Sequence, residues 1–383
     1  MIRKVYIRSW GCQMNVRDSE VICGLLKKEG YQITDNPSNA DIVIFNTCSV
    51  RQHAEDKVWS EIGKFSKADS KRRTPYAVRG TRPIIGLVGC MAQNYKEGVF
   101  ERAAAVDFVV GPSDINKIPQ ILKKLSGRDL FEVKVWETNG TVRPEDIYHT
   151  GYYEDKEHAY VVISEGCSNY CSYCVVPYVR GEIQHRHHKN ILREIEEGVE
   201  SGIKRFTLLG QNVNAYQDED INFVRLIELV NAVNGLKEFS FITSHPKDTF
   251  LDLFKTMRDC EKLKKYLHLP IQSGSDRILK LMNRGYTRKF YLDLADNYRK
   301  IVKDGVLTTD IIVGFPTESE EDFQATRDLV ENVRFDAGFI FKYSPRPGTG
   351  AARMPDDIPI KEKKRRHKII LELQKEISKG KKC

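Results

Sequence analysis

The stretch EGCSNYCSYCVVPYVRG (Glu165–Gly181) decides how the second half of this chain is interpreted. It places Cys167, Cys171 and Cys174 in a C-x3-C-x2-C pattern directly after an apolar run at 159–164. Three thiolates at this spacing can wrap a loop around one inorganic cluster and bind three irons of a [4Fe–4S] cube. The fourth iron is then open and can bind a substrate or cofactor, whereas a fully ligated cluster passes electrons.

A zinc site is the main alternative that the residues leave open. Structural zinc usually takes four ligands, and no fourth Cys or His stands at a suitable short spacing. His185, His187 and His188 are near in the sequence, but they lie beyond Pro177 and Gly181. A chance cluster of thiols is the other alternative. The spacing favours an iron–sulfur cluster over both.

The segment from 151 to 360 predicts an α/β fold of its own, a partial (βα)6 TIM-like barrel. Such a barrel carries its active face at the carboxyl ends of the strands. The strands are expected at 159–164, 205–210, 239–244, 266–271, 307–314 and 338–344, with helices that begin near Lys189, Asn222, Lys247, Asp276, Arg288 and Glu318.

Polar residues follow several of these strands and predict a ligand site. Polar side chains and a glycine turn at successive strand ends can hold a ribose, an adenine and an amino-acid group. Each residue taken alone could equally be a helix cap or a loop residue. The candidates are Gln211, Asn212, Ser244, His245, Gln272, Ser273, Asp310 and Gly314.

Residues 1–125 predict an open parallel α/β sheet domain, because strand and helix patterns alternate along them. Three of the expected strands end in a cysteine, namely Cys12, Cys48 and Cys90. Sites in open α/β sheets form outside the carboxyl ends of strands, so three thiols far apart in sequence can converge there. The alternative is three buried structural thiols, since free Cys often packs as a small hydrophobe.

The composition is that of a soluble globular protein. The 383 residues are 40% hydrophobic and 30% charged, enough for two or three domains with an ordinary core. No apolar run of 18 residues and no signal-peptide pattern is present, so we expect a cytoplasmic protein without a membrane span. Nine cysteines in a reducing compartment favour metal binding or redox chemistry over disulfides. A net charge of +8 indicates either an RNA partner or a merely basic protein.

Three further segments stand apart from the alternating strand and helix patterns. Residues 126–150 predict a linker, residues 66–82 predict an exposed basic loop that faces solvent or RNA, and residues 361–383 predict a basic C-terminal helix. Three cysteines lack the strand-end context and are expected not to be ligands: Cys23, Cys260 and Cys383.

The cysteine loop combined with Cys12, Cys48 and Cys90 resembles the radical S-adenosylmethionine (SAM) methylthiotransferase family. Tyr173, immediately before the last loop cysteine, matches the aromatic position of radical SAM loops. The resemblance implies two [4Fe–4S] clusters, one in each domain, each with an open iron. The barrel cluster would bind SAM and generate a 5′-deoxyadenosyl radical, and the N-terminal cluster would deliver sulfur.

Further motifs resemble the branch of the family that acts on N6-isopentenyladenosine beside the tRNA anticodon. The resemblance implies insertion of a methylthio group at C2 of that base. Methylthiolation of a ribosomal-protein aspartate and a non-catalytic Fe–S RNA-binding protein are the alternatives. The motifs are GCQMN (Gly11–Asn15), CVVPYVRGE (Cys174–Glu182), LLGQNVNAY (Leu208–Tyr216), HLPIQSGSDRILKLMNRGYTR (His268–Arg288) and DIIVGFPTE (Asp310–Glu318).

Two departures from the family pattern affect substrate binding. Members typically carry Ser-Arg after RGE, whereas here His185 precedes Arg186. Arg180, Glu182 and Arg186 are candidate substrate contacts, although Arg180 and Glu182 could instead pair structurally. Members also continue into a small TRAM β-barrel, whereas this sequence stops at Cys383, where that domain would begin; we expect either a protein without a TRAM domain or a truncated chain. The implied partners of the expected monomer are tRNA, a low-potential electron donor and a sulfur source.

Overall fold

The computed structural model describes residues 3–49, 52–66, 82–126 and 133–380. They form two compact units. The first contains residues up to 156 together with 178–184, and the second contains 157–177 and the residues from 185 onward. Within these described ranges, no helix is long and apolar enough to cross a membrane. The predicted basic loop at 66–82 lies almost wholly outside them.

The first unit is built on a six-stranded parallel sheet with strand order β2-β1-β3-β4-β5-β6. Every residue of β3 and β4 is buried, as expected for a parallel sheet covered on both faces. This architecture confirms the α/β fold predicted for the N-terminal part. The strands are β1 (Lys4–Trp10), β2 (Gln32–Ile33), β3 (Ile42–Thr47), β4 (Ile84–Val88), β5 (Phe108–Val110) and β6 (Val135–Glu137).

Helices connect the strands of this sheet. Cys12 takes the N-cap position of the first helix, and Asn15 closes a capping box with it. The start of this helix is therefore tied to the end of β1. The helices are α1 (Gln13–Lys28), α2 (Gln52–Ser66), α3 (Cys90–Tyr95), α4 (Gly98–Arg102) and α5 (Ile118–Leu125), with 3-10 turns η1 (Pro37–Asn39), η3 (Pro112–Lys117) and η4 (Glu145–Tyr148).

Part of the segment interpreted as a linker is built into the first unit. Strand β6 extends the sheet at its edge, and the Arg143 guanidinium donates to the buried Asp18 carboxylate at 2.7 Å. Tyr148 is buried as well. A three-residue strand and two anchoring side chains leave no periodic sequence signal, so these contacts come from tertiary packing alone.

The second unit has six parallel strands in two groups, ordered β13-β10-β7 and β14-β15-β16. A parallel bridge from Phe239 in β13 to Leu263, just before β14, continues the series from one group to the next. The strands thus follow one another in chain order, as in a partial barrel. They are β7 (His158–Val162), β10 (Arg205–Leu209), β13 (Glu238–Phe241), β14 (Tyr266–His268), β15 (Val306–Val313) and β16 (Ala337–Lys342).

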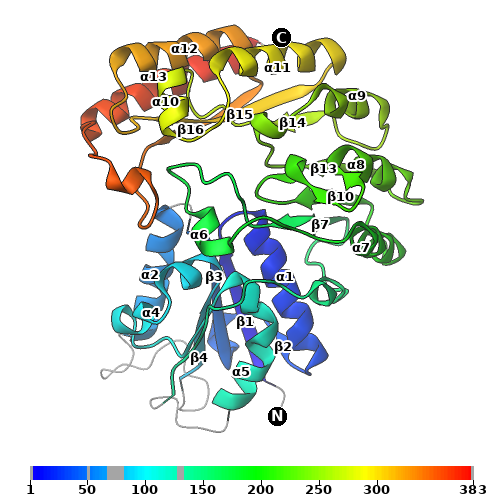
Figure 1. Cartoon of the computed structure of the whole chain (residues 1–383). Helices are drawn as coiled ribbons and strands as arrows, with labels where there is room; N and C mark the ends of the chain where they lie inside the picture. The colour runs from blue at the N-terminus through cyan, green and yellow to red at the C-terminus, as the bar shows by residue number, and fades with distance from the viewer. Residues whose placement is uncertain (1–2, 50–51, 67–81, 127–132, 381–383) are drawn as a thin grey trace. The chain divides into compact units, whose positions relative to one another are not determined.

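The helices of this unit begin close to their predicted starts. The exception is the helix expected near Lys247, because the 3-10 turn η6 (Pro246–Asp248) precedes it. Figure 1 shows α11, α12 and α13 lying along one side of β15 and β16. The helices are α7 (His188–Glu200), α8 (Phe223–Ala232), α9 (Leu251–Asp259), α10 (Asp276–Leu281), α11 (Arg288–Ile301), α12 (Glu320–Val333) and α13 (Ile360–Gly380). Short elements are β8 (Ser164–Glu165), η5 (Val213–Ala215), β11 (Gln217–Asp218), β12 (Ile221–Asn222) and η7 (Ala351–Arg353). Two more, α6 (Val176–Arg180) and β9 (Gln184–His185), each contain residues of both units.

The basic C-terminal helix is anchored by a buried ion pair. In α13, Ile370 and Ile377 are buried. Arg366 Nη1 donates to Glu318 Oε2 at 2.7 Å, and both side chains are almost fully buried. Glu318 also accepts the Gly314 N–H at 2.6 Å. Burial raises the pKa of the Glu318 carboxyl. The hydrogen bond and positive charge of Arg366 oppose this rise and stabilise the carboxylate.

We predict that Arg366→Met destabilises the protein by about 3–5 kcal/mol, because it leaves a buried carboxylate without its cation. Chemical denaturation measures the change. Lys368→Met is the matched control, since Lys368 on the same helix is exposed and lies 3.8 Å from Glu372. This control is expected to stay within about 0.5 kcal/mol of wild type. Equal losses in both variants would contradict the anchoring role.

Candidate iron–sulfur and SAM sites

Three cysteines of the first unit meet at the carboxyl edge of its sheet. Cys12 follows β1 and Cys48 follows β3, the neighbouring strands between which the chain changes direction across the sheet. Cys90 follows β4 and opens α3. The Cys12 and Cys48 side chains are within hydrogen-bonding distance, and Cys12 and Cys90 are close enough for their charges to interact. The structure therefore brings these three predicted thiols together.

Glycines before two of these cysteines make room for the arrangement. A Cβ on Gly11 would lie 2.2 Å from Asn15 Oδ1 and 2.8 Å from Cys48 Cβ. Gly89 has φ +88°, and a Cβ there would lie 2.4 Å from Asn46 Oδ1. Both positions are closed to any side chain, and Gly89 also needs the left-handed backbone that glycine adopts without strain.

Asn15 and Asn46 support the site, although the sequence patterns did not assign them a role. Asn15 Oδ1 accepts the Cys12 N–H at 3.3 Å, and its Nδ2 donates to Asn46 Oδ1 at 3.0 Å. Asn46 Nδ2 donates back to the Asn15 carbonyl at 2.8 Å. Both side chains are fully buried. The available signal was Asn46 itself, an amide that directly follows the apolar run IVIF within a buried strand.

Charge around this site favours a thiolate. A hydrogen bond from Cys48 lowers the pKa of Cys12 to about 6, with smaller contributions from the Arg180 guanidinium and from N–H groups at the start of α1. Arg180 Nε donates to Cys90 Sγ at 3.2 Å, and its Nη2 donates to Asp18 at 2.6 Å. Burial nevertheless raises the pKa of Cys90. Arg180, a predicted substrate contact, is thus buried against the thiols.

The other two predicted substrate contacts lie in different surroundings. Glu182 is exposed on the first unit. Arg186 belongs to the second unit and is buried, and its Nη1 donates to the Val162 carbonyl and the Glu194 carboxylate, both at 2.6 Å. Arg186 therefore ties α7 to β7. For both residues, contact with RNA stays a prediction.

The second cysteine set lies in a loop of the second unit. Cys167, Cys171 and Cys174 are near enough for their charges to interact. Burial raises the pKa of Cys174 to about 12 and also raises that of Cys167. Asn283 Nδ2 donates to two carbonyls of the loop, each at 3.1 Å. Arg284 Nη1 donates to Cys171 Sγ at 3.4 Å.

The separation of the thiols argues against a single zinc ion in either set. With Zn–S distances of about 2.3 Å, a zinc ion holds its sulfurs roughly 4 Å apart. Across the described ranges, the one group of three potential ligand atoms within 4.8 Å of one another is His187, His188 and Glu219. Neither cysteine set is so compact. A fourth ligand from these histidines is not observed either, since they gather around Asp218 and Glu219.

Strand ends of the second unit carry buried polar atoms that have no hydrogen-bond partner. Buried polar atoms are normally paired, so this set fits a polar ligand. Five of the six atoms belong to predicted cofactor residues, and the sixth belongs to Ser164, at the end of the first apolar run. Burial lowers the pKa of His245 to about 2, so its ring is neutral. The atoms are Ser164 Oγ, Gln211 Oε1, Asn212 Oδ1, Ser244 Oγ, His245 Nε2 and Gln272 Oε1.

The remaining predicted cofactor residues make contacts within the second unit. Their role toward SAM stays a prediction. Tyr173 Oη accepts from Arg284 at 3.3 Å, Ser273 Oγ lies 3.4 Å from Thr326 Oγ1, Asp310 Oδ2 lies 3.4 Å from His268 Nε2, and the Gly314 N–H donates to Glu318.

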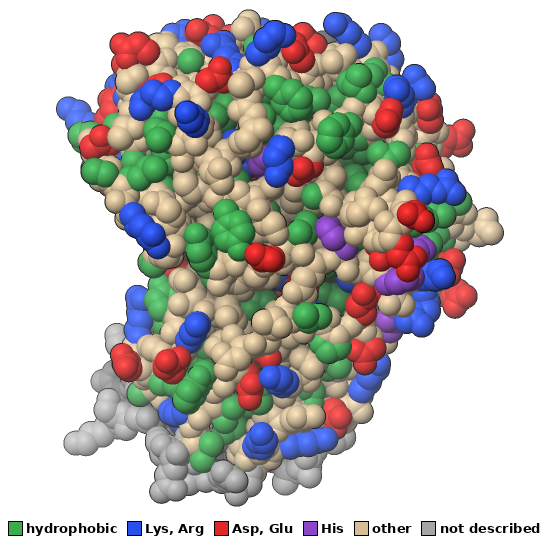
Figure 2. All heavy atoms as spheres, viewed as in Figure 1, with side chains coloured by type: hydrophobic (Ala, Val, Ile, Leu, Met, Phe, Trp, Pro, Cys, Tyr) green, Lys and Arg blue, Asp and Glu red, His purple; other side chains and the backbone are tan. Residues whose placement is uncertain are grey.

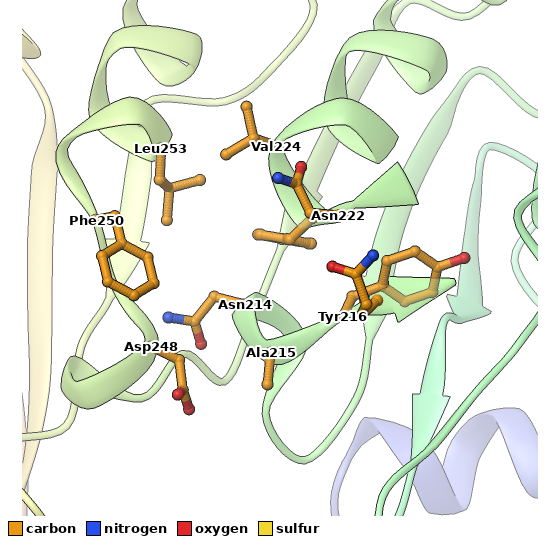
Figure 3. Close-up of a pocket in the computed structure, with 10 residues that line it drawn as sticks. Asn214, Ala215, Tyr216, Asn222, Val224, Asp248, Phe250 and Leu253 are labelled. Carbon is orange, nitrogen blue, oxygen red and sulfur yellow. The ribbon is translucent and has the colours of Figure 1, made fainter. Parts of the chain in front are cut away.

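A pocket of about 340 Å³ lies in the loops that follow β10 and β13 (Figure 3). Val224, Phe250 and Leu253 form its apolar side, and Asp248 lines it from η6. Asp248 Oδ2 accepts from Asn212 Nδ2 at 2.6 Å, which connects the pocket to the polar set. Its volume fits a small organic group.

Comparison with known proteins identifies the family. Residues 4–111 match the family model described as Uncharacterized protein family UPF0004, and residues 161–330 match the Radical SAM superfamily. The tRNA-2-methylthio-N(6)-dimethylallyladenosine synthase of Thermoanaerobacter sp. is 43% identical, over 97% of this chain and 78% of that protein. The protein of the same name from Moorella thermoacetica is 42% identical, over 98% of this chain and 84% of that protein. This chain belongs to the radical SAM methylthiotransferases.

A solved structure agrees with the fold of this methylthiotransferase. The radical S-adenosylmethionine methyltransferase TsrM from Kitasatospora setae gives a TM-score of 0.63 at 14% identity, covering 88% of this chain and 73% of that chain. Likeness at this identity concerns the fold alone. The family membership confirms the enzyme class predicted from the sequence, and it implies SAM and a [4Fe–4S] cluster as cofactors.

We predict that Gly89→Ala lowers the iron content of this methylthiotransferase. The substitution costs about 1–3 kcal/mol of backbone strain and pushes Asn46 away from Asn15. Iron analysis after anaerobic reconstitution and thermal denaturation measure the two effects. Gly98→Ala is the control, because a Cβ there meets nothing within 4 Å. Full iron and unchanged stability in Gly89→Ala would refute the close fit.

Proposed function

We propose that this chain inserts a methylthio group at C2 of N6-isopentenyladenosine beside the anticodon of tRNA. The observation that supports this most strongly is the similarity, over nearly the whole chain, to proteins named for making 2-methylthio-N(6)-dimethylallyladenosine. Methylthiolation of a ribosomal-protein aspartate is the alternative within the family. Mass spectrometry of nucleosides from cells with and without the gene distinguishes the two.

The two cysteine sets would divide the reaction between the units. Cys167, Cys171 and Cys174 would hold the cluster at which SAM binds, and the first unit's three thiols would hold a second [4Fe–4S] cluster. When bound, the barrel cluster and SAM supply a radical that removes hydrogen from a C–H bond too inert for acid–base chemistry. A low-potential electron donor and a sulfur source are the partners that this chemistry requires.

The unpaired polar atoms of the second unit would bind SAM. They are buried at successive strand ends, so ordering them when a ligand arrives would cost little entropy. The neutral His245 ring offers a nitrogen without adding charge beside a sulfonium. Their burial keeps water away from the reacting groups.

Binding of tRNA would use cations spread over the surface. Figure 2 shows Lys and Arg side chains interspersed with Asp and Glu over the face in view. The net charge of +8 supports attraction to a phosphate backbone, and such binding weakens as salt rises. We further propose that the chain acts as a monomer.

We predict that the two triple variants separate the two roles. Replacing Cys167, Cys171 and Cys174 by Ala is expected to leave about half of the iron and to abolish deoxyadenosine formation from SAM. Replacing Cys12, Cys48 and Cys90 by Ala is expected to spare SAM cleavage but to abolish methylthio product. Iron analysis and chromatography of the products measure both.

The control for these variants uses cysteines that are buried but not at the sites. Cys23→Ala and Cys260→Ala are expected to keep the full iron load, because Cys23 lies inside α1 and Cys260 follows α9, so neither stands at a strand end. Unchanged methylthio product in the N-terminal triple variant, or deoxyadenosine from the barrel triple variant, would contradict the roles assigned to the two cysteine sets.

A further prediction separates ligand binding from stability at Ser244. Its buried hydroxyl has no partner, so Ser244→Ala is expected to leave the stability of the SAM-free protein unchanged or slightly higher. SAM affinity should fall roughly fivefold, the equivalent of one lost hydrogen bond of about 1 kcal/mol. Calorimetric titration with SAM and thermal denaturation test this. A stability loss with unchanged affinity would assign Ser244 to the fold.

A further inference from the structure

Arg284 is a buried cation held against the cysteine loop of the second unit. It is 4% exposed. Its Nη1 donates to Cys171 Sγ at 3.4 Å and to Tyr173 Oη at 3.3 Å. Its Nε donates to Tyr286 Oη at 2.9 Å, and its Nη2 donates to the Pro270 carbonyl at 2.8 Å. The guanidinium is therefore fixed on several sides, with one N–H directed at a cysteine sulfur.

None of these acceptors is a carboxylate. Other buried arginines of the same unit pair with one: Arg366 with Glu318 at 2.7 Å, and Arg186 with Glu194 at 2.6 Å. A buried charge without a counter-charge costs several kcal/mol. A cation buried beside three thiols would be stabilised by a negatively charged group bound at the cysteine loop.

An iron–sulfur cube held by three thiolates carries net negative charge, and one further electron makes it more negative. Hydrogen bonds to the sulfurs and nearby charge set the reduction potential of such clusters. A cation and an N–H···S hydrogen bond stabilise the reduced form more than the oxidised form, because the extra electron increases the charge on the sulfurs. Reduction adds one electron from the low-potential donor, and no bond forms or breaks.

We propose that Arg284 is a positioning residue that anchors Cys171 and raises the reduction potential of the barrel cluster. The inference rests on the proposed function, in which Cys167, Cys171 and Cys174 bind that cluster. The higher potential brings reduction within reach of the cell's electron donor. In the first unit, Arg180 also donates to a cysteine sulfur, but it shares the Asp18 carboxylate. Arg284 should therefore raise the potential of the cluster in its unit more than Arg180 raises that of the cluster in the first unit.

The experiment is a redox titration of Arg284→Gln, followed by electron paramagnetic resonance without SAM. The reference protein and the variant both carry Cys12, Cys48 and Cys90 replaced by Ala, so that one cluster contributes the signal. The reference protein is otherwise wild type. At a fixed solution potential, the ratio of reduced to oxidised cluster should fall at least tenfold. For one electron this fall equals a potential about 59 mV more negative. Arg284→Lys keeps the positive charge, so its ratio of reduced to oxidised cluster should fall less than that of Arg284→Gln.

Arg366→Gln is the matched control, because it removes a buried arginine of the same unit that contacts no sulfur. It should lose stability while keeping the wild-type potential. An Arg284→Gln protein with full iron and an unchanged potential would overturn the inference and leave the cluster assignment intact. Absence of iron from the parent that retains Cys167, Cys171 and Cys174 would instead overturn the proposed function.

Arg284→Lys decides the question if Arg284→Gln does not retain iron. A lysine lacks the planar fork that reaches Cys171, Tyr173 and Pro270 together. The ratio of reduced to oxidised cluster should then fall at least threefold below wild type at the same solution potential. A wild-type potential in an iron-loaded Arg284→Lys protein would overturn the role of this residue.

Discussion

Both sites depend on thiols held close together in a buried place, where their negative charges repel and water cannot stabilise them. Burial raises the pKa of Cys90, Cys167 and Cys174, so each thiolate forms only with help. At Cys12 that help lowers the pKa to about 6, through the Cys48 hydrogen bond first. A bound cluster would complete this compensation, since metal ligation requires deprotonated thiols.

The parallel strands solve the geometric part of this problem. Each strand is fixed by its neighbours until its last residue, so a cysteine just beyond it can be placed without a long loop. Gly11 and Gly89 then allow the chain to approach Asn15 and Asn46 more closely than a side chain would permit. The buried amide pair fixes the start of α1 against the end of β3, which holds Cys12 beside Cys48.

Several buried polar groups of the second unit lack hydrogen-bond partners in the ligand-free protein. Six polar atoms without partners, together with a buried guanidinium that has no carboxylate, lower the stability of the ligand-free protein. Proteins commonly accept such costs where a ligand is bound. The C-terminal helix offsets some of this cost, since Arg366 and the apolar side chains around Ile370 anchor it to the barrel.

Local sequence determined most strands, most helix starts and the cysteines at strand ends, because each depends on a pattern within about ten residues. The motifs also carried the family resemblance. Tertiary structure alone decided which side chains meet across long separations. Arg180 and Cys90 are 90 residues apart, and Arg284 and Cys171 are 113 apart. No periodicity links such pairs, so the sequence left Arg180 as a substrate candidate and gave no role to Arg284.

Contacts made only in the folded chain also explain why the sequence did not predict the surroundings of Arg186 and Asn15 or the presence of β6. A single arginine in a polar stretch gives no sign of burial, and only the packing of α7 on β7 places Arg186 against Glu194. The amide pair of Asn15 and Asn46 exists only once β1 and β3 are neighbours. Strand β6 is too short to show a pattern and forms because the edge of β5 offers it backbone partners.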